Sequence, residues 1–252
     1  MPYKLTNAQL RVLDEINNDM KSDKAMNRLI QGDVGSGKTI IAIISMLNAV
    51  ESGYQASMMA PTEILAAQHY QTTVEYLKNS DIDIEVAFLS GSTTKKNKTE
   101  ILKKLKNNEI DILIGTHALI EKNVEFANIG LAITDEQHRF GVRQRAMLGN
   151  KRNDGTPDVL VMTATPIPRT LALMVYGDLD ISIIDEMPPN RQQIITKVLN
   201  GNKKDIAYEF IIDEIKKGRQ AYIVAPLIEE SEKLELDSAT EIYESLKNDY
   251  FS

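Results

Sequence analysis

Residues 32–39 read GDVGSGKT, and this spacing of two glycines before a lysine–threonine pair is typical of a phosphate-binding loop. Glycine tolerates left-handed backbone angles and lets phosphate oxygens approach the main chain. Backbone N–H groups and the start of the following helix then converge on one anion. Lys38 would reach the β and γ phosphates, and Thr39 would offer its hydroxyl to Mg²⁺. The predicted ATP-binding residues here are Gly32, Asp33, Val34, Gly35, Ser36, Gly37, Lys38 and Thr39.

A carboxylate pair follows a later apolar segment, in the run LAITDEQH. Mg²⁺ bound to phosphates keeps several waters and takes few protein carboxylates, and Asp135 at a strand end suits that role. Glu136, one residue further on, would orient and deprotonate the attacking water. An Asp-Glu pair at a strand end also fits a cap or an exposed edge. Its combination with the phosphate loop favours the catalytic interpretation, with Lys38, Asp135 and Glu136 as catalytic residues and Thr39 and Asp135 as the Mg²⁺ ligands.

Two threonines, Thr163 and Thr165, lie at the end of the next apolar segment. Open α/β sheets bind ligands at the carboxyl ends of their strands, so both hydroxyls are expected near the phosphate site. They could relay hydrogen bonds from the γ-phosphate to neighbouring parts of the protein. A Thr-Pro turn with a capped helix is the simpler alternative.

Short β-branched runs alternate with longer amphipathic segments, and Gly, Pro, Asn or Asp separates them. This alternation predicts a doubly wound, mainly parallel α/β sheet. Candidate strands cover residues 27–31, 55–60, 85–90, 111–116, 131–135 and 159–164. Candidate helices cover residues 38–52, 63–78, 94–107 and 168–176.

A Pro-Pro-Asn break at residues 188–190 predicts a domain boundary, with domain 1 over residues 1–189 and part of a second α/β domain over 190–252. The alternation restarts there with strands at 194–199 and 221–226 and helices at 203–217 and 238–247. This is too little for a complete domain, so we expect the second domain to be truncated.

The 252 residues are 42% hydrophobic and 26% charged, which is an ordinary globular composition. The absence of cysteine excludes disulfides, a cysteine nucleophile and thiolate metal sites. The first ten residues lack a signal-peptide pattern, and no apolar run approaches the roughly 18 residues of a membrane span. We therefore expect a cytoplasmic protein without a membrane role. The net charge of −7 argues against binding nucleic acid through overall charge, although a local basic groove is compatible with it.

Six blocks of this sequence together resemble superfamily 2 helicase motors, and within that group the RecG family. They are LTNAQ, GDVGSGKT, APTEILAAQHY, GTHALI, ITDEQHRFGVRQR and MTATPIPRT, in the family's order and spacing over nearly the whole chain. The resemblance implies that the predicted sheet is of the RecA-like P-loop NTPase class. The motor of the transcription-repair coupling factor shares similar wording and is the alternative. Gln137 and Ser36 depart from its usual glutamate and tyrosine, and both departures favour RecG.

The resemblance implies further roles for individual residues. Gln9 matches the glutamine that reads the adenine edge, and Tyr3 would stack on the base. Gln137, His138, Thr163 and Thr165 would couple the nucleotide to DNA and to the second domain. The residues implied on the DNA side are Pro61, Thr62, Glu63, Ser90, Gly91, Ser92, Gly115, Thr116 and His117. Six lysines at 95, 96, 98, 103, 104 and 106 could line a DNA path, but a solvated helix face is the favoured interpretation.

The resemblance also implies an activity, namely ATP- and Mg²⁺-dependent translocation on branched or fork DNA in recombination and repair. The implied partners are DNA, recognised without regard to sequence, and the remainder of a parent protein, which includes a wedge domain and the rest of the second motor domain. In this family an arginine late in the second domain reaches the γ-phosphate, and such a residue is worth about a thousandfold in rate. Because the chain stops earlier, we expect it to bind nucleotide and to hydrolyse it slowly.

Two functions of other classes compete with a helicase motor. A small-molecule kinase could use the same phosphate loop, but it would need lid arginines and an acceptor pocket that ITDEQHRFGVRQR does not supply. A nucleotide-sensing switch without catalysis would have little need of Glu136.

Overall fold

The computed structural model describes residues 4–78, 83–135, 156–165, 179–187, 194–200, 204–225 and 239–250. Four predicted site residues lie outside these ranges, namely Tyr3, Glu136, Gln137 and His138, as does the predicted helix 168–176. The chain divides into two compact units, Met1–Arg191 and Gln192–Ser252, and each is described by itself.

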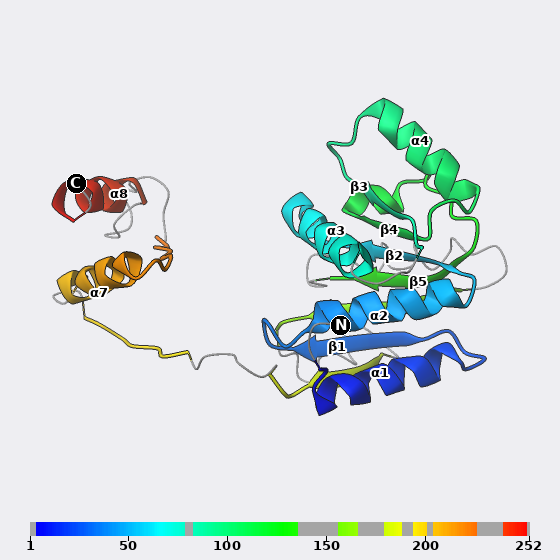
Figure 1. The fold of residues 1–252 in the computed structure, drawn as a ribbon, viewed down its shortest axis with the longest axis horizontal. Helices are drawn as coiled ribbons and strands as arrows, with labels where there is room; N and C mark the ends of the chain where they lie inside the picture. The colour runs from blue at the N-terminus through cyan, green and yellow to red at the C-terminus, as the bar shows by residue number, and fades with distance from the viewer. Residues whose placement is uncertain are drawn as a thin grey trace. The chain divides into compact units, whose positions relative to one another are not determined.

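The first unit is built on a seven-stranded sheet in the order β3-β4-β2-β5-β6-β1-β7 (Figure 1). Every pair of neighbouring strands is parallel, as the alternation of strands and helices predicts. The strands are β1 (Asn27–Gly32), β2 (Gln55–Met59), β3 (Val86–Leu89), β4 (Ile112–Gly115), β5 (Ile129–Thr134), β6 (Asp158–Thr163) and β7 (Asp180–Ile184).

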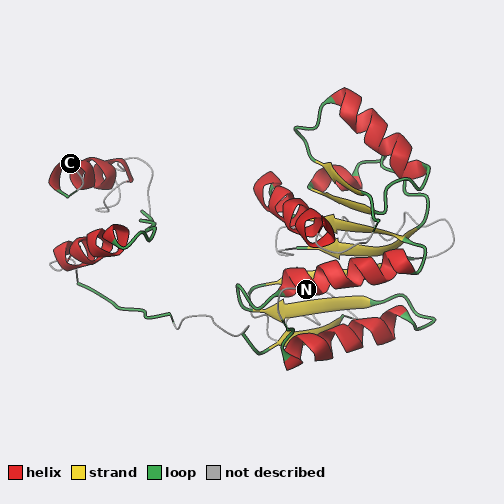
Figure 2. Cartoon of the chain, in the orientation of Figure 1, coloured by secondary structure: helices red, strands yellow, loops and turns green. Residues whose placement is uncertain are grey.

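Helices cover both faces of this sheet (Figure 2). One hydrophobic core joins α1, α2 and α3 to one face of the strands, and a second core joins α4 and the short η1 helix to the other face of β4, β2 and β5. The helices of this unit are α1 (Asn7–Met20), α2 (Lys38–Glu51), α3 (Glu63–Lys78), α4 (Lys95–Lys106) and the 3-10 helix η1 (His117–Ile120).

Side chains along the central strands point alternately to the two cores. In β2, Met58 belongs to the core under α1 and α2, and Met59 belongs to the core under α4. In β5, Ile133 belongs to the core under α1 and α2, and Ala132 belongs to the core under α4. Because both faces are covered, β2 and β5 are buried along their whole length and are mostly apolar, and this is why the sequence identifies them as strands.

The predicted sheet is confirmed for six strands, β1 to β6, whose bounds differ from the predicted ranges by up to two residues. Three elements were not predicted, namely α1, β7 and the 3-10 helix η1, whose four residues are too few to show a helical period. The helix α1 is amphipathic, and its capping box, in which Thr6 and Gln9 bond reciprocally, is a recognisable start signal. The strand β7 is a short edge strand that pairs with β1, and a five-residue run gives little periodicity to detect.

In the second unit, the described residues form the helices α7 (Lys204–Lys216) and α8 (Ala239–Asp249). The rings of Tyr208 and Tyr250 contact each other at 5.0 Å between centroids. The strands predicted at 194–199 and 221–226 are wrong as far as the structure describes them, because residues 194–200 and 221–225 have no regular secondary structure. Most of their apolar side chains are exposed, and an apolar run becomes a strand only where a neighbouring strand binds its backbone.

Candidate nucleotide and metal site

The predicted site residues gather at one edge of the sheet. Gly32, Asp135 and Thr163 lie at or just after the carboxyl ends of β1, β5 and β6, which are neighbours in the order β5-β6-β1. Neighbouring strands lie about 4.8 Å apart, so the ends of β1 and β5 are separated by about 10 Å. This is the edge at which open α/β sheets bind ligands.

The phosphate loop connects β1 directly to α2. Gly35 and Gly37 have positive φ angles of 82° and 88°, and Gly37 begins α2 in a left-handed conformation. A Cβ atom on Gly37 would lie 2.2 Å from the side-chain nitrogen of Gln9, so this position requires glycine for space as well as for its backbone angle. Among the described residues, no side chain caps the start of α2. The first turn of α2 therefore presents its main-chain dipole to the loop.

Lys38 lies inside the loop. Its ammonium group donates to the carbonyl oxygens of Gly32 at 2.7 Å and Asp33 at 3.1 Å. These contacts hold a positive charge at the centre of the turn, where an anionic phosphate would experience it at close range.

Gln9 joins α1 to the phosphate loop. The side-chain nitrogen of Gln9 donates to the Ser36 carbonyl at 2.9 Å, and its side-chain oxygen accepts from the Thr6 backbone N–H at 2.9 Å. Gln9 is buried, so these bonds are shielded from water. The predicted adenine-reading residue therefore lies against the loop and supports its shape.

Asp135 is fixed at the end of β5 from two directions. Its backbone N–H donates to the carbonyl of Met59 in β2 at 2.8 Å. Its carboxylate oxygen Oδ2 lies 2.7 Å from Nε2 of His69 in α3. Both side chains are buried, and His69 is a site residue that the sequence analysis missed. The contact spans 66 positions in the sequence, and a histidine in an amphipathic helix gives no signal of its partner.

Thr163 and Thr165 contact each other at the end of β6. Their hydroxyl oxygens lie 2.8 Å apart, and the Thr165 backbone N–H donates to the Thr163 hydroxyl at 3.1 Å. Thr163 is fully buried and pairs with Gln31 of β1, so it lies next to the strand that leads into the phosphate loop.

The residues at this edge fit ATP and Mg²⁺. The side-chain hydroxyl of Ser36 is buried without a hydrogen-bond partner in the described part of the chain, inside a turn whose backbone is shaped for an anion. Asp135 and Thr39 supply oxygen ligands of the kind that Mg²⁺ prefers. Among the described residues, no group of three or more His, Asp or Glu side chains is placed to hold a metal ion.

The predicted DNA-side residues lie on the other half of the same edge. Segments 61–63, 90–92 and 115–117 are at or directly after the ends of β2, β3 and β4, which are neighbours in the sheet. The Ser92 hydroxyl donates to the Glu63 carboxylate, and the Thr116 N–H donates to the carbonyl of Leu89 at 3.2 Å. The hydroxyl of Thr116 is buried without a hydrogen-bond partner among the described residues. His117 is exposed.

Half of the lysine cluster on and around α4 pairs with carboxylates. Lys98 lies 2.7 Å from Glu121, Lys106 lies 2.6 Å from Glu125, and Lys104 lies 3.6 Å from Glu100. This pairing reduces the positive field that the helix presents, and it agrees with the solvated-face interpretation of these lysines.

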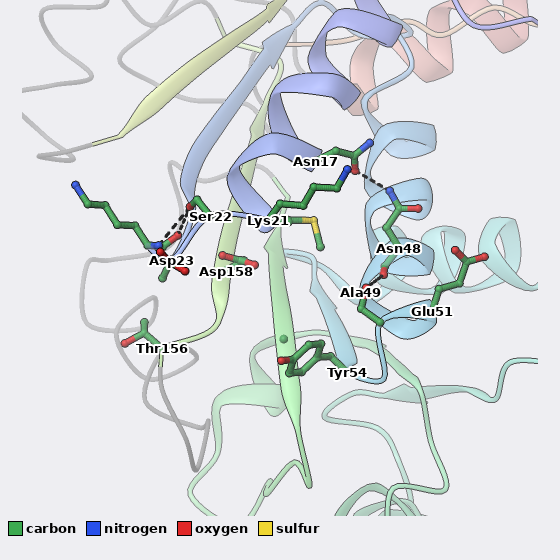
Figure 3. A pocket seen from close by; sticks show the side chains of 15 residues that line it. Asn17, Lys21, Ser22, Asp23, Asn48, Ala49, Glu51, Tyr54, Thr156 and Asp158 are labelled. Atoms are coloured by element: carbon green, nitrogen blue, oxygen red, sulfur yellow. Dashed lines mark hydrogen bonds between the residues drawn. The ribbon is translucent and has the colours of Figure 1, made fainter.

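A hollow of about 880 Å³ lies at the opposite, amino edge of the sheet (Figure 3). It lies between the carboxyl-terminal ends of α1 and α2 and is bordered by Tyr54, Gly130 and Asp158, near the starts of β2, β5 and β6. Asn17 and Asn48 bond across it at 2.8 Å. Because the strands are parallel, this hollow is separate from the edge that carries Gly32, Asp135 and Thr163.

Comparisons with known proteins agree with this arrangement. The chain is 55% identical over 247 residues to the ATP-dependent DNA helicase RecG of Aquifex aeolicus, covering 98% of this chain and 31% of that protein. It is 53% identical over 251 residues to RecG of Thermotoga maritima, covering 100% of this chain and 32% of that protein. The chain thus spans about a third of the length of the curated relatives it matches.

Solved structures show the same fold. RecG bound to a three-way DNA junction matches with a TM-score of 0.83 and 48% identity, covering 100% of this chain and 32% of that one. The DUF1998 helicase MrfA matches with a TM-score of 0.68 and 15% identity, covering 98% of this chain and 38% of that one, which bears on the fold alone. In the described part of the chain, no helix combines the length and hydropathy needed to cross a membrane.

The family model of the DEAD/DEAH box helicases matches residues 6–174. The matched range takes in the phosphate loop, Asp135, Thr163 and Thr165, and it covers more than half of the chain. This chain therefore belongs to the DEAD/DEAH box helicase family.

Proposed function

We propose that this chain is the ATP-binding motor of a RecG-like DNA helicase that acts on branched DNA in recombination and repair. One observation carries the proposal. The ammonium group of Lys38 lies inside the phosphate loop, and the buried carboxylate of Asp135 lies two strands away at the same edge of the sheet. The RecG proteins at 53–55% identity support the choice of substrate class.

In this proposal the phosphate loop binds the triphosphate of ATP, with Lys38 moving from the carbonyls of Gly32 and Asp33 to the phosphate oxygens. Thr39 and Asp135 hold Mg²⁺, which neutralises phosphate charge when it is bound. Glu136, which follows Asp135 directly, orients the attacking water and accepts its proton. Gln9 supports the loop and meets the adenine edge, and Tyr3 stacks on the base.

DNA would bind along the half of the edge that carries segments 61–63, 90–92 and 115–117. Hydroxyl and backbone N–H groups at strand ends and helix starts suit contacts to phosphodiesters that do not read base sequence. Gln137, His138, Thr163 and Thr165 would transmit the state of the nucleotide to this surface. Since Thr163 and Thr165 lie between the strands of the phosphate loop and Asp135, they are well placed for that role.

The whole RecG-like protein would couple ATP hydrolysis to movement on duplex DNA and so drive fork regression and branch migration. Its other parts, a wedge domain and the rest of a second motor domain, would be the partners of this chain. Because the proposed substrate is chromosomal DNA, the protein would act in the bacterial cytoplasm.

The proposal is tested by direct binding of a fluorescent ATP analogue in the presence of Mg²⁺, with and without a forked duplex. Lys38→Ala should weaken nucleotide binding at least tenfold, because it removes the charge at the centre of the loop. Lys24→Ala, at the opposite edge of the sheet, is the matched control and should bind as the wild type does. Equal affinities for wild type and Lys38→Ala would contradict the proposed nucleotide site.

A second measurement separates a helicase motor from a kinase. In the whole RecG-like protein, hydrolysis should release free phosphate, and a forked duplex should increase the rate more than a linear duplex of the same length. Phosphate that appears on an acceptor molecule, or a rate that ignores DNA, would contradict the motor function.

A further inference from the structure

His69 makes a buried contact with the carboxylate that is proposed to hold Mg²⁺. Nε2 of His69 lies 2.7 Å from Oδ2 of Asp135, and the two residues are 7% and 9% exposed. Burial matters because a hydrogen bond to a carboxylate that is shielded from water fixes its orientation more firmly than one in solvent.

The direction of this hydrogen bond follows from the chemistry of the partners. A carboxylate that binds a metal is ionised and can only accept hydrogen bonds, so Nε2 of His69 must carry the proton and donate it. The bond to Oδ2 therefore restricts the rotation of the whole carboxylate group of Asp135. The backbone N–H of Asp135 donates to Met59 at 2.8 Å, which holds the main chain of the same residue.

The helix α3 holds His69 firmly in this position. Ala66, His69, Thr73 and Leu77 are all buried, and their spacing of three and four residues makes one continuous stripe along α3. The Thr73 hydroxyl donates to the His69 carbonyl at 2.8 Å. Tyr70 adds a ring contact with Phe88 of β3 at 5.7 Å between centroids. The imidazole is therefore part of a packed interface and not a mobile surface group.

We propose that His69 is a positioning residue for the metal site, which donates a hydrogen bond from Nε2 to Oδ2 of Asp135 and so holds this carboxylate in the orientation in which it would bind Mg²⁺. This inference rests on the proposed function, because it assumes that Mg·ATP binds at the phosphate loop. It adds a residue from α3, a helix outside the phosphate loop and the strand ends, to the set that determines metal affinity.

The same helix carries a second consequence of the proposal. α3 begins at Glu63, which accepts a hydrogen bond from Ser92 on the proposed DNA side. His69 is six residues further on, which is about 9 Å along the helix axis. One rigid helix thus carries both the DNA-side contact and the support of Asp135.

The test measures how Mg²⁺ tightens binding of a fluorescent ATP analogue to the whole chain, starting from EDTA. His69→Leu introduces an apolar side chain of similar bulk, which cannot donate a hydrogen bond. In EDTA, His69→Leu should bind the analogue with the affinity of the wild type. The Mg²⁺ concentration that gives half of the increase in analogue affinity should be about 10- to 100-fold higher than for the wild type, because a hydrogen-bond partner of a metal ligand is lost.

Two other substitutions at this position distinguish lost support from general damage. The amide nitrogen of glutamine reaches about as far from the backbone as Nε2 of histidine, so His69→Gln should restore Mg²⁺ dependence to within about threefold of the wild type. The shorter His69→Asn should not restore it. This pair decides the question even if His69→Leu does not fold.

Thr73→Val is the control for packing, because it removes the bond to the His69 carbonyl and leaves the imidazole in place. It should titrate with Mg²⁺ as the wild type does. The positioning role is overturned if His69→Leu and His69→Asn follow the wild-type titration, or if Thr73→Val is as impaired as they are. A wild-type chain whose binding ignores Mg²⁺ would overturn the proposed function together with this inference.

Discussion

The side-chain nitrogen of Gln9 donates to the carbonyl oxygen of Ser36 at 2.9 Å, across 27 positions of sequence. This bond fixes the phosphate loop to the start of α1 before any nucleotide arrives. The shape of the loop is therefore set partly from outside the loop, by a residue in the first turn of the first helix.

Gln9→Ala should destabilise the chain and weaken nucleotide binding together. It removes bonds to the Ser36 carbonyl and the Thr6 N–H, each worth about 1 kcal/mol, so the free energy of unfolding should fall by about 2 kcal/mol. Urea unfolding and analogue binding measure the two effects. Gln71→Ala, on an exposed position of α3, should change neither. If Gln9→Ala unfolds at the same urea concentration as the wild type, the two side-chain bonds of Gln9 contribute little to the free energy of unfolding.

Gly115 at the end of β4 tolerates no side chain. A Cβ atom there would lie 1.8 Å from the carbonyl oxygen of Leu89 and 2.7 Å from Cδ1 of Leu119. Gly115→Ala must therefore shift backbone in β3 or β4, and it should lower the free energy of unfolding by about 1 to 3 kcal/mol. Gly91→Ala, where a Cβ atom meets nothing within 4 Å, is the control in the same denaturation experiment. Similar stability for both variants would contradict this packing argument.

Arg28 organises a partly buried polar cluster between α1, β1 and β7. Its guanidinium bonds to Asp19 at 2.6 Å and to Ser182 at 2.8 Å, and it pairs with Glu15 at 3.3 Å. Arg28→Ala would remove charge-assisted bonds to two partly exposed carboxylates and a buried hydroxyl, so we expect a loss of about 1 to 3 kcal/mol in the free energy of unfolding. Arg11→Ala removes an exposed arginine from the same helix α1 and should have a much smaller effect. Chemical denaturation of both variants should show the larger loss of stability in Arg28→Ala.

The Arg11 guanidinium lowers the pKa of Asp185 below its ordinary value of 3.8, chiefly through a side-chain hydrogen bond of 2.9 Å. Because the folded pKa is the lower one, the contribution to stability is present above pH 3.8 and is lost as the pH falls through the folded pKa. An NMR titration of the Asp185 carboxyl carbon should show the lowered pKa, and Arg11→Ala should return it toward 3.8. An unchanged pKa in Arg11→Ala would contradict this assignment.

Glu63→Gln should strengthen DNA binding if the proposed DNA surface is correct. Glutamine can still accept the bond from Ser92, but it removes a negative charge facing phosphodiesters. One charge about 6 Å away in water is worth about 0.7 kcal/mol, or roughly threefold in affinity. Fluorescence anisotropy of a labelled forked duplex at low salt measures the change, which should shrink at high salt. Glu51→Gln, at the opposite edge of the sheet, is the control; an equal gain there would contradict the proposed surface.

The sheet was predictable because its central strands are covered on both faces, so segments such as 112–115 and 129–134 are apolar without interruption. The phosphate loop was predictable because its chemistry depends on consecutive residues. The edge strand β7 and the contact of His69 with Asp135 were not, since both depend on which distant segments become neighbours. The predicted strands at 194–199 and 221–226 were wrong for the same reason, because a segment becomes a strand only when the backbone of a neighbouring strand binds it.

The pairing of Met59 in β2 with Thr134 in β5 has a mechanical consequence. These residues are the last of their strands, and they stand on one rung of the sheet, directly beneath the proposed DNA surface and the proposed metal site. A displacement of either strand end would therefore reach the other through the backbone of the sheet, in addition to the side-chain route proposed for Thr163 and Thr165. The sheet itself would then couple the proposed metal site to the proposed DNA surface.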